Sequence, residues 1–123
     1  MSLHIAIFED DKDLADHLQE LLEDLNYDVT VLYKLDPKAN WKRVDVILAD
    51  YRNQIVRFGD VVKLGQEKNV PVIAISGGDM DYKPCLQKPF SIEEMQSVIV
   101  KAMMKKANDE DDSLFSIFRS RAG

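Results

Sequence analysis

Short apolar runs alternate with longer amphipathic stretches along the chain. Five runs have the length and composition of strands, at residues 3–8, 27–33, 44–49, 70–75 and 85–87. The run at 44–49 is almost continuously apolar, which is typical of a strand buried on both faces of a parallel sheet. Amphipathic stretches predict helices after the first run, near residues 58–68, and from Ser91 onward. This alternation predicts an α/β domain with helices on both faces of a parallel sheet.

The ends of two predicted helices carry recognisable signals. The helix after the first strand has a leucine stripe at Leu14, Leu18, Leu22 and Leu25. Asn26 is placed to end this helix in the left-handed conformation. Ser91 and Glu94 form a capping box at the start of the last helix, and Phe90 and Met95 occupy the positions of a hydrophobic staple. The sequence alone therefore marks the end of the first helix and the start of the last.

Two connections are poor in helical signals. Residues 34–43 contain Pro37 and few periodic apolar positions, so we expect a loop or a short helix. Only the eight residues 77–84 separate Ser76 from Cys85. A helical crossover between parallel strands needs about a dozen residues or more. We therefore expect a loop between the fourth and fifth strands.

Length and composition bound the function. The 123 residues suit one domain, and 46% of them are apolar, which is enough for a core. A net charge of −6 argues against binding to nucleic acid. The apolar runs are too short to cross a membrane, and no secretory signal is visible. A single cysteine, Cys85, fits a reducing compartment, so we expect a cytoplasmic protein.

Chemically active side chains follow four predicted strands. Glu9 and Asp10 follow the first strand, Asp50 the third, Ser76 the fourth and Lys88 the fifth. The carboxyl ends of parallel strands share one edge of a sheet, so the topology brings these groups together. Clustered carboxylates repel one another unless a cation is present, and Mg²⁺ is the most plausible hard cation with oxygen ligands. The sequence predicts a metal-assisted phosphoryl site with a carboxylate nucleophile.

These residues resemble the receiver domain of bacterial two-component response regulators. The resemblance covers about residues 3–104, and its pieces are 7–11, 44–50, 70–77 and 86–91, each of which includes a predicted strand end. It implies a flavodoxin-like, doubly wound sheet of five parallel strands in the order 2-1-3-4-5. In this chain a loop replaces the usual fourth helix. The resemblance also implies a cis peptide bond between Lys88 and Pro89.

The resemblance implies an acceptor and a metal site. Asp50 would accept a phosphoryl group from a histidine kinase or a histidine phosphotransfer protein. Glu9 and Asp10 would hold Mg²⁺, together with Asp50 and the backbone carbonyl of Arg52. The phosphorylated domain would then change conformation and be read by a downstream protein target.

The resemblance assigns three further residues around the phosphoryl group. Ser76 would be the switch hydroxyl, and Lys88 would contact the phosphoryl oxygens. Gly77 would keep access to the site open. Cys85 departs from the family, which usually has an aromatic residue there, and Gln54 stands where a proline is common.

Two other functions remain open on the sequence. The first is a phosphorylation-independent pseudo-receiver that acts as a protein-interaction module, which the missing helix and Cys85 favour. The second is an Mg²⁺-dependent phosphohydrolase. Some such enzymes need a second aspartate two residues after the nucleophile, and Arg52 occupies that position. We therefore expect no enzyme. Asp11 taken alone is a helix cap rather than a ligand.

A change in composition marks the end of the domain. An acidic run at residues 109–112 divides a receiver domain of residues 1–107 from residues 108–123, an acidic linker with a short apolar tail. Leu114, Ile117 and Phe118 have helical spacing and give one apolar face. This tail either docks on the surface left open by the missing helix, docks on a partner, or is a disordered end.

Overall fold

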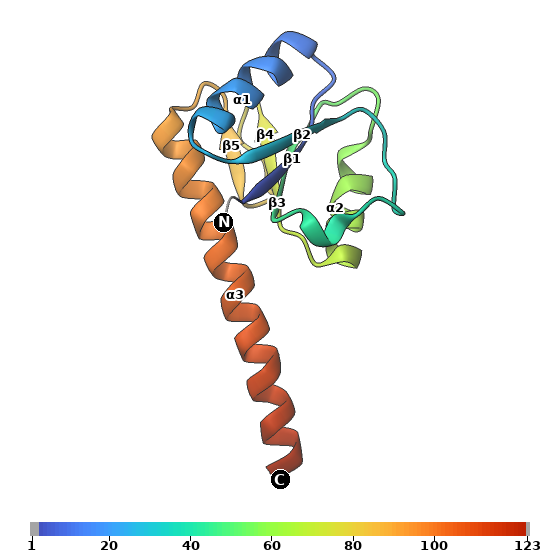
Figure 1. Cartoon of the computed structure of the whole chain (residues 1–123), viewed down its shortest axis with the longest axis vertical. Helices are drawn as coiled ribbons and strands as arrows, with labels where there is room; N and C mark the ends of the chain where they lie inside the picture. The colour runs from blue at the N-terminus through green and yellow to red at the C-terminus, as the bar shows by residue number, and fades with distance from the viewer. Residues whose placement is uncertain (1–2, 123) are drawn as a thin grey trace.

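A five-stranded parallel sheet forms the centre of the molecule (Figure 1). The computed structural model describes the backbone of residues 3–122 and the side chains of residues 3–107. The strand order is β2-β1-β3-β4-β5, as predicted. The strands are β1 (His4–Phe8), β2 (Asp28–Leu32), β3 (Val46–Asp50), β4 (Val72–Ser76) and β5 (Cys85–Gln87).

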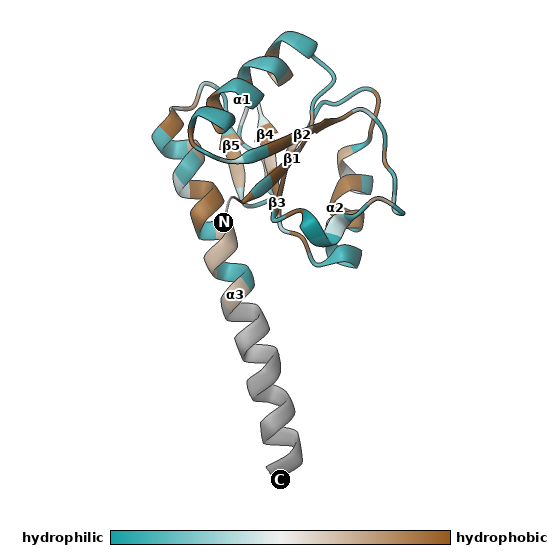
Figure 2. Cartoon of the chain, in the orientation of Figure 1, coloured by the Kyte–Doolittle hydropathy of each residue, from teal (hydrophilic) through white to brown (hydrophobic). Residues whose placement is uncertain are grey.

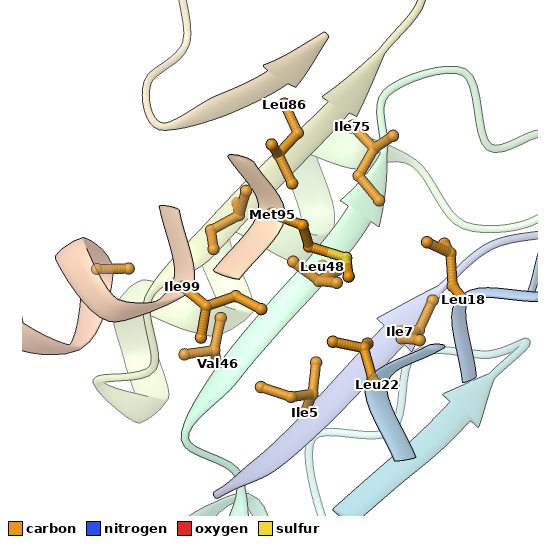
Figure 3. Packing of buried hydrophobic residues seen from close by; sticks show 12 residues of the cluster. Ile5, Ile7, Leu18, Leu22, Val46, Leu48, Ile75, Leu86, Met95 and Ile99 are labelled. Carbon is orange, nitrogen blue, oxygen red and sulfur yellow. The ribbon is translucent and has the colours of Figure 1, made fainter. Parts of the chain in front are cut away.

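Helices cover the two faces of the sheet unequally. They are α1 (Lys12–Asp24), α2 (Phe58–Lys68), α3 (Ile92–Ala122) and the 3₁₀ turn η1 (Trp41–Arg43). Helices α1 and α3 pack on one face, where Leu18, Leu22, Met95 and Ile99 meet apolar strand residues (Figure 3). Helix α2 packs on the other face through Val61 and Leu64. The strands are mostly apolar while the helices are more polar, as Figure 2 shows.

The predicted helix ends are present. Asn26 has a φ of 68°, directly after the last turn of α1. The Asp11 side chain caps α1 by accepting from the backbone N–H groups of Asp13 and Leu14 at 3.1 and 3.3 Å. At the start of α3 the Ser91 hydroxyl accepts from the Glu94 N–H at 3.0 Å. The Lys88–Pro89 bond is cis, as the resemblance implied, and Lys83–Pro84 is also cis.

Strands β1 and β2 begin one residue later than the apolar pattern predicted, and β3 and β4 begin two residues later. Val44 precedes β3, and its N–H donates to the Trp41 carbonyl at 3.1 Å, which closes η1. Val70 precedes β4, and its N–H donates to the Gly65 carbonyl at 2.8 Å, which closes α2. Val44 and Val70 contribute apolar side chains to the core, but their backbone N–H groups bond to carbonyls at the ends of η1 and α2 instead of to a neighbouring strand.

Aromatic side chains from the two connections cover the α2 face. Trp41 stacks on Phe8 with ring centroids 6.2 Å apart, and its indole N–H donates to the Asp36 carbonyl at 2.7 Å. Tyr82 meets Phe58 edge-on at 5.0 Å, and its hydroxyl donates to the Val72 carbonyl at 2.8 Å. Residues 77–84 contain no helix, as predicted. Tyr82 therefore covers part of the sheet face that a fourth helix would otherwise cover.

Helix α3 runs beyond the sheet (Figure 1). Its backbone continues through residue 108 to Ala122. The helix continues across the predicted boundary between residues 1–107 and 108–123, and the division into a domain and a tail remains a prediction. The predicted docking of Leu114, Ile117 and Phe118 concerns side chains outside the described residues and also remains a prediction. No helix in the described part of the chain is long and apolar enough to cross a membrane.

Candidate functional site

Three carboxylates meet at the carboxyl edge of the sheet. Glu9 and Asp10 directly follow β1, and Asp50 is the last residue of β3. These strands are neighbours with Phe8 paired to Ala49, so the residues after them come together. One carboxylate oxygen from each of Glu9, Asp10 and Asp50 lies within 4.8 Å of the other two. The parallel topology thus concentrates negative charge at one point.

Glu9 has the least water-accessible of these carboxylates. Its side chain is 1% exposed. Oε1 accepts from the Asp11 N–H at 3.0 Å, whereas Oε2 is buried with no hydrogen-bond partner among the described residues. Burial raises the pKa of Glu9 to about 7, and the negative charges of Asp50 and Asp10 act in the same direction. The Asp11 N–H and the Lys88 charge oppose this rise in pKa.

The loop after β3 is bonded to the other two carboxylates. The Arg52 N–H donates to Asp50 Oδ1 at 3.3 Å, and the Gln54 N–H donates to Asp10 Oδ2 at 3.0 Å. A proline at position 54 could not donate the second bond. The resemblance to receiver domains singled out Gln54 only because a proline is common at this position. Its part in orienting Asp10 was missed, because a backbone amide leaves no signal in the residue type.

Ser76 and Lys88 complete the group at the adjacent strand ends. Ser76 is 7% exposed, and its Oγ accepts from the Gly78 N–H at 3.2 Å. The Lys88 N–H donates to the Ser76 carbonyl at 2.7 Å, which joins the end of β5 to the end of β4. The half-buried Lys88 side chain is close enough for its charge to lower the pKa of Glu9. All five side chains predicted at strand ends therefore lie along one edge.

Gly77 and Arg52 are the remaining residues assigned from the resemblance. A Cβ added to Gly77 would meet no atom within 4 Å, so the space beside this residue is open. The Arg52 side chain is exposed, and the backbone N–H of Arg52 donates to Asp50. The role of the Arg52 carbonyl as a metal ligand remains a prediction.

The donor set fits a hard divalent cation. Carboxylate oxygens are the ligands that Mg²⁺ takes in proteins. The buried Glu9 Oε2 has no donor among the described residues, and a buried anionic oxygen without a partner is costly. A cation between Glu9, Asp10 and Asp50 would satisfy this oxygen and relieve the repulsion among the three carboxylates.

Comparisons with known proteins give structural matches only. Neither protein-family models nor curated proteins match the sequence. A response regulator receiver domain protein from Clostridium thermocellum superposes with a TM-score of 0.72 at 18% identity, covering 85% of this chain and 97% of that one. The anti-anti-sigma factor PhyR from Bartonella quintana gives a TM-score of 0.74 at 21% identity, covering 92% of this chain and 52% of that one.

A third match bears on the metal. It is the receiver domain of the sensor histidine kinase PA1611 from Pseudomonas aeruginosa, described with a magnesium ion coordinated in its active-site cleft. The TM-score is 0.69 at 20% identity, with 84% of this chain and 98% of that one covered. At such identities the matches establish the fold: this chain has the fold of response regulator receiver domains.

Proposed function

We propose that the chain is a response regulator receiver that accepts a phosphoryl group on Asp50 in the presence of Mg²⁺. The observation that carries the proposal is the convergence of oxygens from Glu9, Asp10 and Asp50 within 4.8 Å in a receiver fold. A histidine kinase or a histidine phosphotransfer protein would be the donor. A downstream protein would read the product.

The chemistry is a nucleophilic displacement at phosphorus. An Asp50 carboxylate oxygen attacks the phosphorus of a phosphohistidine and forms an acyl phosphate. The P–N bond breaks, and the histidine nitrogen leaves with the electron pair and takes up a proton. Glu9, Asp10, Asp50 and the Arg52 carbonyl would hold Mg²⁺, which when bound neutralises charge on the carboxylates and the phosphoryl oxygens.

The neighbouring strand ends would bind the phosphoryl oxygens. The Lys88 ammonium supplies a positive charge, and the Ser76 hydroxyl supplies a hydrogen-bond donor once it turns from the Gly78 N–H. The open space beside Gly77 admits the donor. Turning of Ser76 would change the 77–84 connection, which is bonded to the sheet through Tyr82. This connection is where we place the conformational signal.

The proposed receiver acts stoichiometrically. Slow hydrolysis of its own acyl phosphate would reset it, so it is not an enzyme acting on an external substrate. We place it in the cytoplasm, which suits its single free cysteine and its proposed phosphodonor. We propose protein partners rather than nucleic acid for this domain, because its net charge is −6.

A phosphorylation-independent interaction module is the second candidate. Two observations favour it: the 77–84 connection has no helix, and Cys85 replaces the aromatic residue usual in the family. A thiol side chain cannot repeat the rotation of an aromatic ring. Coupling from Ser76 to the surface must then use another route, or be absent.

Chemical mapping of the acceptor distinguishes the two candidates. The protein is incubated with Mg²⁺ and acetyl phosphate and then reduced with borohydride, which converts an aspartyl phosphate to homoserine. Peptide mass spectrometry should find homoserine at position 50 only. The control Asp16→Asn, at an exposed carboxylate on α1, should leave this modification unchanged. Modification at another residue, or none, would favour the interaction module.

A further inference from the structure

A groove lies where the 77–84 connection lacks a helix. It has a volume of about 580 Å³ and is bounded by α2, by residues 69–72, by residues 82–84 and by α3. Its apolar lining includes Val62, Val70, Val72, Tyr82 and Ala102. Residues 77–84 contribute no helix to this side of the sheet. Val70, Val72 and Ala102 are at most 7% exposed and form the floor of the groove, whereas Val62 and Tyr82 are half-buried and remain partly open to an occupant.

Lysines surround this apolar floor. They are Lys83, Lys101, Lys105 and Lys106. Lys83 pairs with Asp79 at 3.1 Å, but both side chains are largely exposed, so the ion pair contributes little to stability. The three lysines of α3 form no ion pair with any residue in the range 3–107. A concentrated positive rim in a chain of net charge −6 calls for an acidic, apolar occupant.

The chain contains a segment with that chemistry. Residues 109–112 are all acidic, and Leu114, Phe115, Ile117 and Phe118 follow them. Glu110, Leu114 and Phe118 are spaced four residues apart, so a helix places them on one face. Asp111 and Phe115 have the same spacing on an adjacent row. This segment, residues 109–118, offers acids at one end and a continuous apolar surface at the other.

The path of α3 decides whose groove the segment enters. Residues 92–122 form one helix, which rises about 1.5 Å per residue, so Leu114 lies roughly 13 Å farther along the axis than Lys105. The apolar part of the segment therefore leads away from the groove of its own chain, and docking it there would require α3 to break. Residues 109 and 110 lie only one turn beyond Lys105 and Lys106 of the same helix. Docking into a second copy requires no break.

We propose that two copies of the chain form a dimer in which residues 109–118 of each occupy the lysine-rimmed groove of the other. Both contacts are the same, so the dimer closes with two-fold symmetry. The acids face Lys101 and Lys105, and the apolar residues cover Val62 and Tyr82. The proposal does not rest on phosphorylation, and the Asp50→Asn protein should dimerise equally well.

A charge exchange in the full-length chain tests the dimer. Sedimentation velocity over a range of concentrations should show a monomer–dimer equilibrium that weakens as salt is raised. The groove variant Lys101→Glu/Lys105→Glu and the segment variant Glu110→Lys/Asp111→Lys should each dimerise at least tenfold more weakly. A 1:1 mixture of the two should recover dimers, because each groove then meets a segment of opposite charge.

A matched variant controls for nonspecific charge effects. Lys42→Glu/Lys63→Glu changes the net charge by the same amount at exposed lysines outside the groove, and should dimerise like the unmodified chain. A chain that is monomeric at all concentrations would overturn the proposal. Dimers whose affinity is unchanged by both charge reversals would also overturn it, because a dimer formed through the exposed Val100 and Met104 would behave in this way. Failure of the mixture to recover dimers would also overturn it.

Discussion

At the residue scale, Glu9 carries an ionisable group where water has almost no access. Its Oε2 has no hydrogen-bond partner among the described residues, and two further carboxylates lie beside it. Burial raises the pKa of Glu9 to about 7 from 4.5. Between these values the folded protein holds a proton that the unfolded chain releases. In the absence of metal, the free energy of unfolding should therefore fall as pH rises through this window.

Replacing Glu9 with glutamine tests this environment. In chelator, Glu9→Gln should remove the fall in stability between pH 5 and 8, because glutamine does not ionise. At pH 8 the variant should be more stable than the unmodified chain by on the order of 2 kcal/mol. Urea denaturation at both pH values measures the difference.

An exposed glutamate provides the comparison. Glu20→Gln on the outer side of α1 should keep the pH dependence of the unmodified chain. Added Mg²⁺ should stabilise the unmodified chain at pH 8 and stabilise Glu9→Gln less. Identical pH dependence in the unmodified chain and Glu9→Gln would show that Glu9 ionises as freely as a glutamate in water, and that its burial does not raise its pKa.

At the element scale, α2 approaches β4 closely at one glycine. A Cβ at Gly65 would lie 2.5 Å from Cγ2 of Val72 and 2.7 Å from the Val70 carbonyl oxygen. Real Cβ atoms do not tolerate such distances, and the second neighbour is backbone. Gly65 therefore sets how near α2 can pack to the sheet, and so the position of one wall of the groove.

Two glycines on α2 make a matched pair. Gly65→Ala should destabilise the fold by roughly 1–3 kcal/mol, because the helix must move away from β4. Gly59→Ala, in the first turn, meets no atom within 4 Å and should leave stability unchanged or slightly raised. Thermal denaturation of both variants gives the comparison. Equal melting temperatures would mean that α2 is not held at this distance.

Strands and helices could be predicted from apolar periodicity, but the side chains from the connections that pack against them could not. The caps at Asn26 and Ser91 depend on local patterns, whereas the strand order was implied by the resemblance to receiver domains. Trp41 and Tyr82 lie in stretches without periodicity, so nothing in the sequence showed that they cover the α2 face. Likewise, the site residues at strand ends were predictable, whereas the Gln54 N–H bond to Asp10 depends on the path of a loop.

At the scale of the whole molecule, the two faces of the sheet are covered differently. Helices α1 and α3 close one face, while α2, η1 and aromatic side chains cover the other. The acidic edge lies at the ends of β1 and β3, and the lysine-rimmed groove lies beside β4. Residues 77–84 connect the Ser76 end of the site to the groove.

Intact mass spectrometry tests the role of Asp50 most directly. The full chain and Asp50→Asn are each incubated with acetyl phosphate, with Mg²⁺ or with chelator. We expect one phosphoryl adduct on the unmodified chain with Mg²⁺, and none in the other three samples. An adduct on Asp50→Asn, an adduct formed in chelator, or no adduct on any sample would contradict the assignment of Asp50 as the metal-dependent phosphoryl acceptor.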